Sequence, residues 1–124
     1  MTLNEYQDKA MGTCMQSCDN YSYMMLNLVG EVGEFASRVA KAIRSEKIKI
    51  KDNDICISLD NLEELLPLDE ELKLEAGDIL WQLSGLCHVM GWKLEDVAQA
   101  NLDKLAARKQ AGTIDGNGDG IYER

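Results

Sequence analysis

Two pairs of acidic residues, each with a spacing of three, are the feature of the sequence best suited to chemistry. Glu31 and Glu34 form one pair, and Glu75 and Asp78 form the other. On a helix this spacing leaves two side chains about 60° apart around the axis and about one turn apart along it. Two such pairs on facing helices repel one another and favour a bound cation. Carboxylate oxygens suit Mg²⁺, with Mn²⁺ as the alternative, and both ions bridge to phosphates.

The same carboxylates could instead belong to a solvated surface. The chain has 22 acidic and 13 basic residues, which gives a net charge of −9, and charged helix faces are usually exposed. The position of Glu75 on its helix favours a metal site, because Glu75 lies about 40° from the centre line of an apolar stripe formed by Leu72, Ile79 and Leu86. Buried carboxylates are rare unless they are paired or bound to metal.

A second group of polar residues has the spacing of one helix face. Lys104 and Arg108 are four residues apart, so both can face one anion, and Asn101 precedes Lys104 by three residues. The alternative is that these side chains are simply exposed to solvent. Trp81 could stack on a nucleobase or lie in an interface between subunits.

Composition excludes several classes of protein. An acidic surface repels phosphate backbones, so a nucleic-acid polymer is not an expected partner. No apolar run approaches the ~18 residues that span a bilayer, and no signal-peptide pattern is visible, which predicts a cytoplasmic protein without a membrane partner. The four cysteines lack CxxC spacing and are expected to be free thiols. A di-iron carboxylate bundle is not expected, because that class needs Glu-x-x-His and the residue three positions before His88 is Gly85.

Helices must position these residues, and the expected fold is all-α with a four-helix bundle-like core. A short hairpin or loop insertion, turning at Asp52-Asn53-Asp54, is expected between the second and third long helices. A short helical turn is expected at 61–66, before the third long helix. The four predicted helices span residues 3–18, 21 to about 43, 67 to about 91, and 94 to about 110.

Apolar spacing predicts which helix faces point inward. On the second helix the expected inward stripe is Tyr21, Met25, Leu28, Val32, Phe35, Val39 and Ile43. On the third helix it is Leu72, Ile79, Leu83, Leu86 and Met90. Because Leu80, Trp81 and Val89 point away from that stripe, the third helix has two apolar faces, which predicts a homodimer or homotetramer.

Residues 1–112 form the predicted domain, and residues 113–124 form a Gly-rich tail. The tail contains the first half of an EF-hand loop, from Asp115 to Gly120, but the bidentate Glu of the twelfth position would fall beyond Arg124. We expect the tail to close over a phosphate, with Arg124 at its end.

Four stretches carry a resemblance to a known family: LVGEVGEFA (28–36), LEAGDILWQL (74–83), LEDVAQANLDKLAAR (94–108) and GTIDGNGDGIYER (112–124). Together they resemble the MazG-like, all-α nucleoside triphosphate pyrophosphohydrolase superfamily. Gly30 stands where many members carry an additional Glu, and the segment 35–74 between the acidic pairs looks longer than is usual.

The resemblance implies the residues' roles. Glu31, Glu34, Glu75 and Asp78 match the acidic residues that hold Mg²⁺ in the family. Asn101, Lys104, Arg108 and the GNGD stretch match residues implicated in triphosphate binding.

The implied reaction is hydrolysis of a nucleoside triphosphate (NTP or dNTP) to the monophosphate and pyrophosphate. We assign the general base to Glu34 as a hypothesis. The alternative function is a non-catalytic helical module that binds nucleotides or a protein partner.

Overall fold

The computed structural model describes residues 1–56 and 62–112 of the 124-residue chain. The fold is all-α apart from one small hairpin, which confirms the predicted class. The elements in chain order are α1 (Leu3–Met11), the 3₁₀ turn η1 (Gln16–Cys18), α2 (Tyr21–Arg44), β1 (Lys49–Lys51), β2 (Asp54–Cys56), α3 (Leu62–Val89) and α4 (Leu94–Ala111). No helix in this described part is long and apolar enough to cross a membrane.

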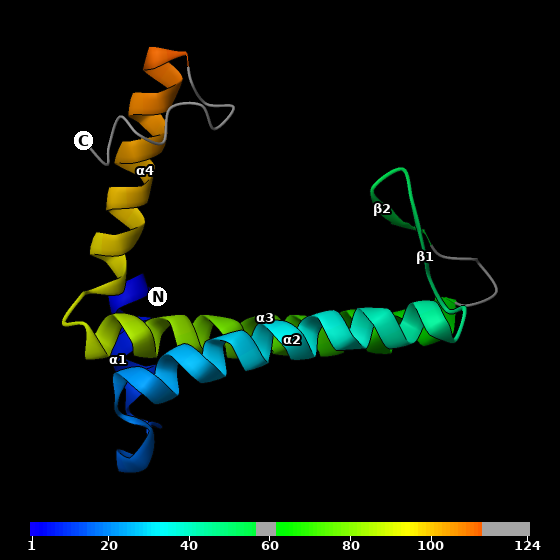
Figure 1. The fold of residues 1–124 in the computed structure, drawn as a ribbon, viewed down its shortest axis with the longest axis horizontal. Coiled ribbons are helices and arrows are strands. Elements are labelled where there is room, and N and C mark those ends of the chain that lie inside the picture. Colours follow the sequence, from blue (N-terminus) through cyan, green and yellow to red (C-terminus); the bar gives the residue numbers. More distant parts are fainter. Residues whose placement is uncertain (57–61, 113–124) are drawn as a thin grey trace.

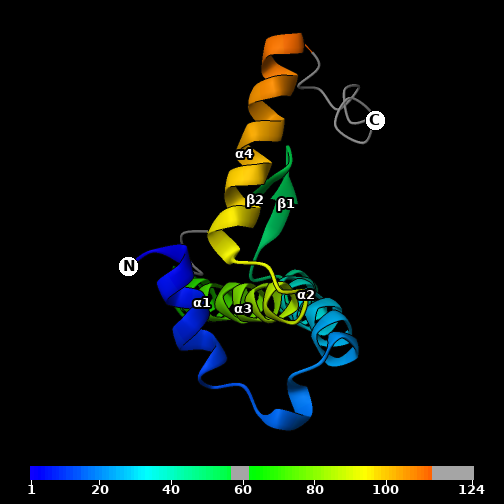
Figure 2. The same ribbon diagram turned by 90° about the vertical axis from the view of Figure 1, so that its left-hand side faces the viewer.

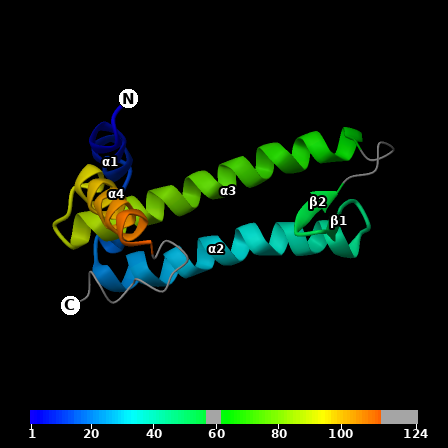
Figure 3. The same ribbon diagram turned by 90° about the horizontal axis from the view of Figure 1, so that it is seen from above.

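The long helices α2 and α3 lie side by side and run antiparallel, and they form the body of the molecule (Figures 1 and 3). Met24 on α2 packs against Gly85 on α3: a Cβ added at Gly85 would overlap Met24 Sδ and Cε. Met24 is 0% exposed, so any shift of its side chain would disturb buried packing. Glycine at position 85 therefore lets the two helices pack closely at this end.

The remaining elements sit at opposite ends of the helix pair. The hairpin lies at one end, and α1 crosses the other end, from which α4 projects sideways away from the pair (Figures 1 and 2). Within a single chain, α2 and α3 are thus paired, while most of α4 extends beyond them.

Side chains of α1 fix the start of α4. α3 ends in a Schellman motif at Gly91, which has φ 75°, and Trp92 N–H donates to Cys87 O at 2.8 Å. The buried Gln7 side chain then accepts a hydrogen bond from Leu94 N–H (2.9 Å) and donates to Trp92 O (3.0 Å). Asn4 Oδ1 accepts from Glu95 N–H at 3.1 Å. Two orphan amides at the N-terminus of α4 are therefore capped from another helix.

The hairpin and α4 agree with the sequence predictions. β1 and β2 pair antiparallel, and the two turn residues Asp52 and Asn53 have φ of 53° and 67°, as a two-residue type I′ turn requires. α4 ends at Ala111, close to the predicted limit, and its C-cap Gly112 has φ 72°. The rest of the expected insertion, residues 57–61, falls outside the described part of the chain.

Two predicted helix limits are wrong. The first helix ends at Met11 instead of continuing to residue 18, and only the 3₁₀ turn η1 follows before α2. The third helix begins at Leu62, so the expected separate turn and Pro67 both belong to α3. Pro67 lies in the second turn, past the amides that a helix start leaves unpaired, so α3 lacks the bond that an N–H at this position would donate to the carbonyl of Glu63.

The predicted inward stripe of α2 is also partly wrong. Tyr21, Val32 and Ile43 are exposed, whereas Met24 and Ala42 are the buried residues of the helix. The face turned to α3 carries Met24 and Ala42 together with the charged Arg38, whose side chain reaches Glu71 and Glu75 on α3. The more apolar neighbouring face has no cover within the described chain.

Candidate active site

Three of the four predicted carboxylates converge between α2 and α3. Glu31, Glu34 and Glu75 each place an oxygen within 4.8 Å of the others. Glu75 is 6% exposed, as its place in the apolar stripe predicted, whereas Glu31 is half-buried and Glu34 is exposed. The helical spacing of Glu31 and Glu34 brings both to the level at which α3 presents Glu75.

Asp78 is exposed and is not one of the three converging residues. It nevertheless acts on the same site electrostatically. The pKa of Glu31 is raised first by burial, then by the negative charges of Asp78, Glu34 and Glu75, and a hydrogen bond from Asn27 opposes this. The cluster therefore carries uncompensated negative charge around Glu31.

Arg38 supplies the cation that this cluster contacts within the described chain. Its Nε donates to Glu75 Oε1 at 2.7 Å, and its Nη1 donates to Glu71 Oε2 at 3.1 Å. The second oxygen of Glu75, Oε2, is buried without a hydrogen-bond partner among the described residues. The sequence prediction omitted Arg38, although its spacing of four from Glu34 places both on one face of α2.

These residues fit a hard divalent cation. The donor set consists of carboxylate oxygens, which such ions prefer. The buried Glu75 Oε2 has an unused acceptor, and an orphaned buried oxygen costs stability until it is paired. Next to burial, the negative charges of Asp78, Glu34 and Glu75 raise the pKa of Glu31, and a bound cation would oppose this effect. Arg38 satisfies one oxygen of the cluster and leaves the rest for a metal ion.

Replacing Glu31 by Gln is expected to raise the melting temperature of the metal-free protein at pH 7. The raised pKa means that the folded state holds the proton more tightly than the unfolded state. Stability from this group is therefore present at low pH and lost as pH rises through the raised pKa, so ionised Glu31 is a cost at pH 7. The advantage of Glu31→Gln over wild type should shrink as the pH is lowered.

Thermal melts in EDTA and in Mg²⁺ check this expectation. Mg²⁺ should stabilise the wild type, by about 2.7 kcal/mol at 100 times its dissociation constant, and should stabilise Glu31→Gln much less. Glu70→Gln is a matched control, because Glu70 is an exposed residue of α3 that pairs with Lys73. A lower melting temperature of Glu31→Gln in EDTA would contradict the account.

A row of polar side chains extends along α2 from the carboxylates towards α1. Asn27 Nδ2 donates to Tyr23 Oη at 3.3 Å and to Glu31 Oε1 at 3.5 Å. The pKa of Tyr23 is raised chiefly by its hydrogen bond with the thiol of Cys18, while Gln82 on α3 lowers it. Gln82 is buried, and its Oε1 has no hydrogen-bond partner in residues 1–56 and 62–112. The prediction missed this row, although Tyr23, Asn27 and Glu31 are spaced by four.

The structure does not bring the predicted triphosphate-binding residues of α4 to the carboxylates of the same chain. Asn101, Lys104 and Arg108 follow the first seven residues of α4, and this helix projects away from the α2–α3 pair (Figure 1). The predicted Arg124 falls outside the described residues.

Trp81 contacts α1. Its indole Nε1 donates to Ala10 O at 3.1 Å and to Thr13 Oγ1 at 2.9 Å. Its N–H thus holds α1 against α3, and only the ring face is left for stacking.

The chain is similar to known proteins in sequence. The profile of the MazG nucleotide pyrophosphohydrolase domain matches residues 19–113, which contain all four carboxylates and α4. The chain belongs to the MazG family. This MazG-family chain is also similar to the "Gene 37 protein" of Mycobacterium phage L5, with 36% identity over 108 residues that cover 87% of this chain and 82% of the phage protein. No solved structure matches it significantly.

Proposed function

We propose that this MazG-family protein hydrolyses a nucleoside triphosphate, NTP or dNTP, to the nucleoside monophosphate and pyrophosphate in a Mg²⁺-dependent reaction. The observation that carries the proposal is the convergence of Glu31, Glu34 and Glu75, with a buried unpaired oxygen on Glu75, in a chain of this family. All four cysteines are free thiols, which fits the reducing cytoplasm where we place the reaction.

The carboxylates have separable tasks in this reaction. Glu31, Glu34 and Glu75, with Asp78 beside them, would hold Mg²⁺, or Mn²⁺ in its place. The ion would neutralise phosphate oxygens and lower the pKa of a bound water. Glu34 is the exposed member, and we assign it to accept the proton of the water that attacks the α-phosphorus, while pyrophosphate departs with the bridging oxygen.

Incubation with a panel of NTPs and dNTPs tests the proposal. Purified protein should release pyrophosphate and monophosphate in equal amounts from at least one nucleotide, in Mg²⁺ but not in EDTA. Nucleotide binding without release would instead support the non-catalytic module. Failure of every nucleotide to yield metal-dependent pyrophosphate would overturn the proposed reaction.

The projecting α4 supports a second part of the proposal, a homo-oligomer. Large apolar side chains are exposed on α2, with Leu26 at 74% and Val32 at 49%, and on α4, with Leu102 at 59%. Large apolar side chains that are exposed in a single chain are expected to be buried in an interface between subunits. We propose that a second copy covers α2 and completes a four-helix bundle. In a homodimer or homotetramer of this kind, Asn101, Lys104 and Arg108 on α4 of one copy would reach the carboxylates of another.

Complementation between two inactive variants is the expected consequence. Glu75→Gln and the double variant Lys104→Ala/Arg108→Ala should each be inactive alone. In a two-fold dimer that shares its sites, random mixing places one intact site in half of the dimers, which restores about a quarter of wild-type activity. Co-expression of differently tagged variants, followed by the pyrophosphate assay, measures this recovery. Mixed oligomers without recovered activity would show that α4 serves its own chain.

A further inference from the structure

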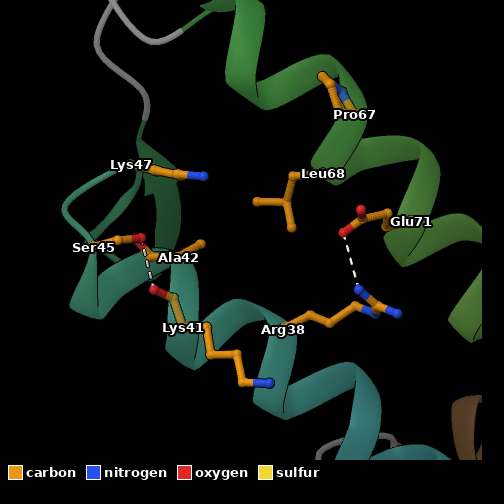
Figure 4. A pocket seen from close by; sticks show the side chains of 8 residues that line it. All are labelled: Arg38, Lys41, Ala42, Ser45, Lys47, Pro67, Leu68 and Glu71. Carbon is orange, nitrogen blue, oxygen red and sulfur yellow. Dashed lines mark hydrogen bonds and ion pairs between the residues drawn. The ribbon is translucent and has the colours of Figure 1, made fainter.

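A cavity of about 210 Å³ lies beside the carboxylates, between the end of α2 and the first turns of α3 (Figure 4). The segment that joins α2 to β1 closes its far side. The lining residues are Arg38, Lys41, Ala42, Ser45, Lys47, Pro67, Leu68 and Glu71.

The charge of this cavity is opposite to that of the protein. Three of its lining side chains are cationic, namely Arg38, Lys41 and Lys47, and one is acidic, namely Glu71. The whole chain has a net charge of −9. A cleft lined by cations attracts anions locally even when the protein as a whole is acidic. This cavity is therefore a place where the protein can bind an anion.

The backbone after α2 holds Lys47 in position. Glu46 has φ 61°, which reverses the chain, and Lys47 N–H donates to Ala42 O at 2.9 Å. The next residue, Ile48, is 2% exposed and anchors the segment. The Lys47 side chain extends into the cavity towards Leu68 on α3 (Figure 4).

A second hollow lies between the cavity and Glu34 of the carboxylate cluster, along α2. This hollow is lined by Glu34, Ser37, Arg38 and Lys41, so Arg38 and Lys41 border both spaces. Glu34, Arg38 and Lys41 are spaced by four and three residues, which covers about 10 Å along one face of the helix. A phosphate chain bound to the carboxylates through a metal ion would therefore extend directly towards Lys41 and Lys47.

We propose that this cavity binds the terminal phosphates of the substrate, with Lys41 and Lys47 as direct ligands and Arg38 moving from Glu71 to phosphate. The inference rests on the proposed pyrophosphohydrolase function and deepens it. Ammonium and guanidinium groups are the usual partners of phosphate oxygens. The substrate then has one orientation: its pyrophosphate lies at the hairpin end of the α2–α3 pair, and its nucleoside lies towards Asn27 and Gln82.

Binding of inorganic tripolyphosphate, measured by calorimetry in Mg²⁺, tests the inference without any turnover. The double variant Lys41→Gln/Lys47→Gln keeps much of the aliphatic stems but removes both charges. It should bind tripolyphosphate about 10-fold or more weakly than wild type, because each lost bond is charge-assisted. The control Lys9→Gln/Lys73→Gln has the same net charge, changes two exposed lysines outside the cavity, and should bind as wild type does.

The outcomes separate this inference from the proposed function. Unchanged binding by Lys41→Gln/Lys47→Gln, an equal loss in the control, or no binding to wild type would overturn the subsite. Pyrophosphate release from nucleotides by wild type would leave the function standing in each case. Loss of tripolyphosphate binding in the cavity variant alone, with no nucleotide cleaved by wild type, would support the subsite and refute the function. The Mg²⁺-induced shift in melting temperature checks that the cavity variant folds and keeps its metal site.

Discussion

Glu75→Gln is expected to lower Mg²⁺-dependent pyrophosphate release by about three orders of magnitude or more. Glu75 is the buried member of the carboxylate cluster, it bridges to Arg38, and its Oε2 is the orphaned oxygen. Substitution by Gln keeps the size of the side chain but removes its charge. The site then loses a metal ligand and the negative partner that orients Arg38, so both rate and metal affinity should fall.

Glu70→Gln is the matched control for this variant. Glu70 lies on the same helix, but its side chain is exposed and pairs with Lys73 at 3.2 Å. Its activity should stay within about twofold of wild type, since surface ion pairs contribute little. Steady-state assays over a range of Mg²⁺ concentrations measure both variants. If Glu75→Gln retained more than a tenth of wild-type activity at saturating Mg²⁺, Glu75 would not be a metal ligand.

Gln7→Leu is expected to destabilise the fold by about 2–4 kcal/mol. The buried Gln7 amide donates to Ser84 O and Trp92 O and accepts from Leu94 N–H. Leucine offers no hydrogen bond, so Leu94 N–H and Trp92 O would lose their partner at the junction of three helices. Loss of the hydrogen bond from Leu94 N–H should contribute most to this effect, because Lys93 provides no side-chain cap for α4.

Denaturant unfolding and hydrogen exchange measure this effect. The midpoint of Gln7→Leu should fall at equal protein concentration, and the first-turn amides of α4 should lose protection before those of α2. Gln110→Leu is the control, since Gln110 is exposed near the end of α4, and its stability should change by less than about 0.5 kcal/mol. Equal midpoints for Gln7→Leu and wild type would refute the bridging role.

The sequence predicts the positions of Glu31, Glu34 and Glu75 well because those positions are set locally within single helices. A spacing of three fixes Glu31 relative to Glu34, and the angle of Glu75 within its apolar stripe predicts burial without knowledge of any partner. Turn chemistry is equally local, so Asp52 and Asn53 locate the hairpin. Gly112 similarly marks the end of α4.

The sequence is less informative where a tertiary contact decides which helix face is buried or how a helix is capped. The periodicity of α2 identifies an apolar stripe but not whether α3 or another surface covers it, and the charged residue Arg38 turns out to face α3. Pro67 is a helix breaker in the interior but is tolerated close to a helix start. Gln7 caps a helix more than 80 residues away in the chain, which no local pattern reveals.

The sideways projection of α4 has a consequence for measurements made at low protein concentration. If the reacting groups are divided between chains, each dissociated chain keeps the carboxylates but lacks the cations that another copy supplies. Specific activity should then fall on dilution, and the concentration at which it halves reports the affinity between subunits. Assay concentration thereby becomes a physical variable of this protein, and kinetic constants measured at nanomolar and micromolar enzyme would describe different populations.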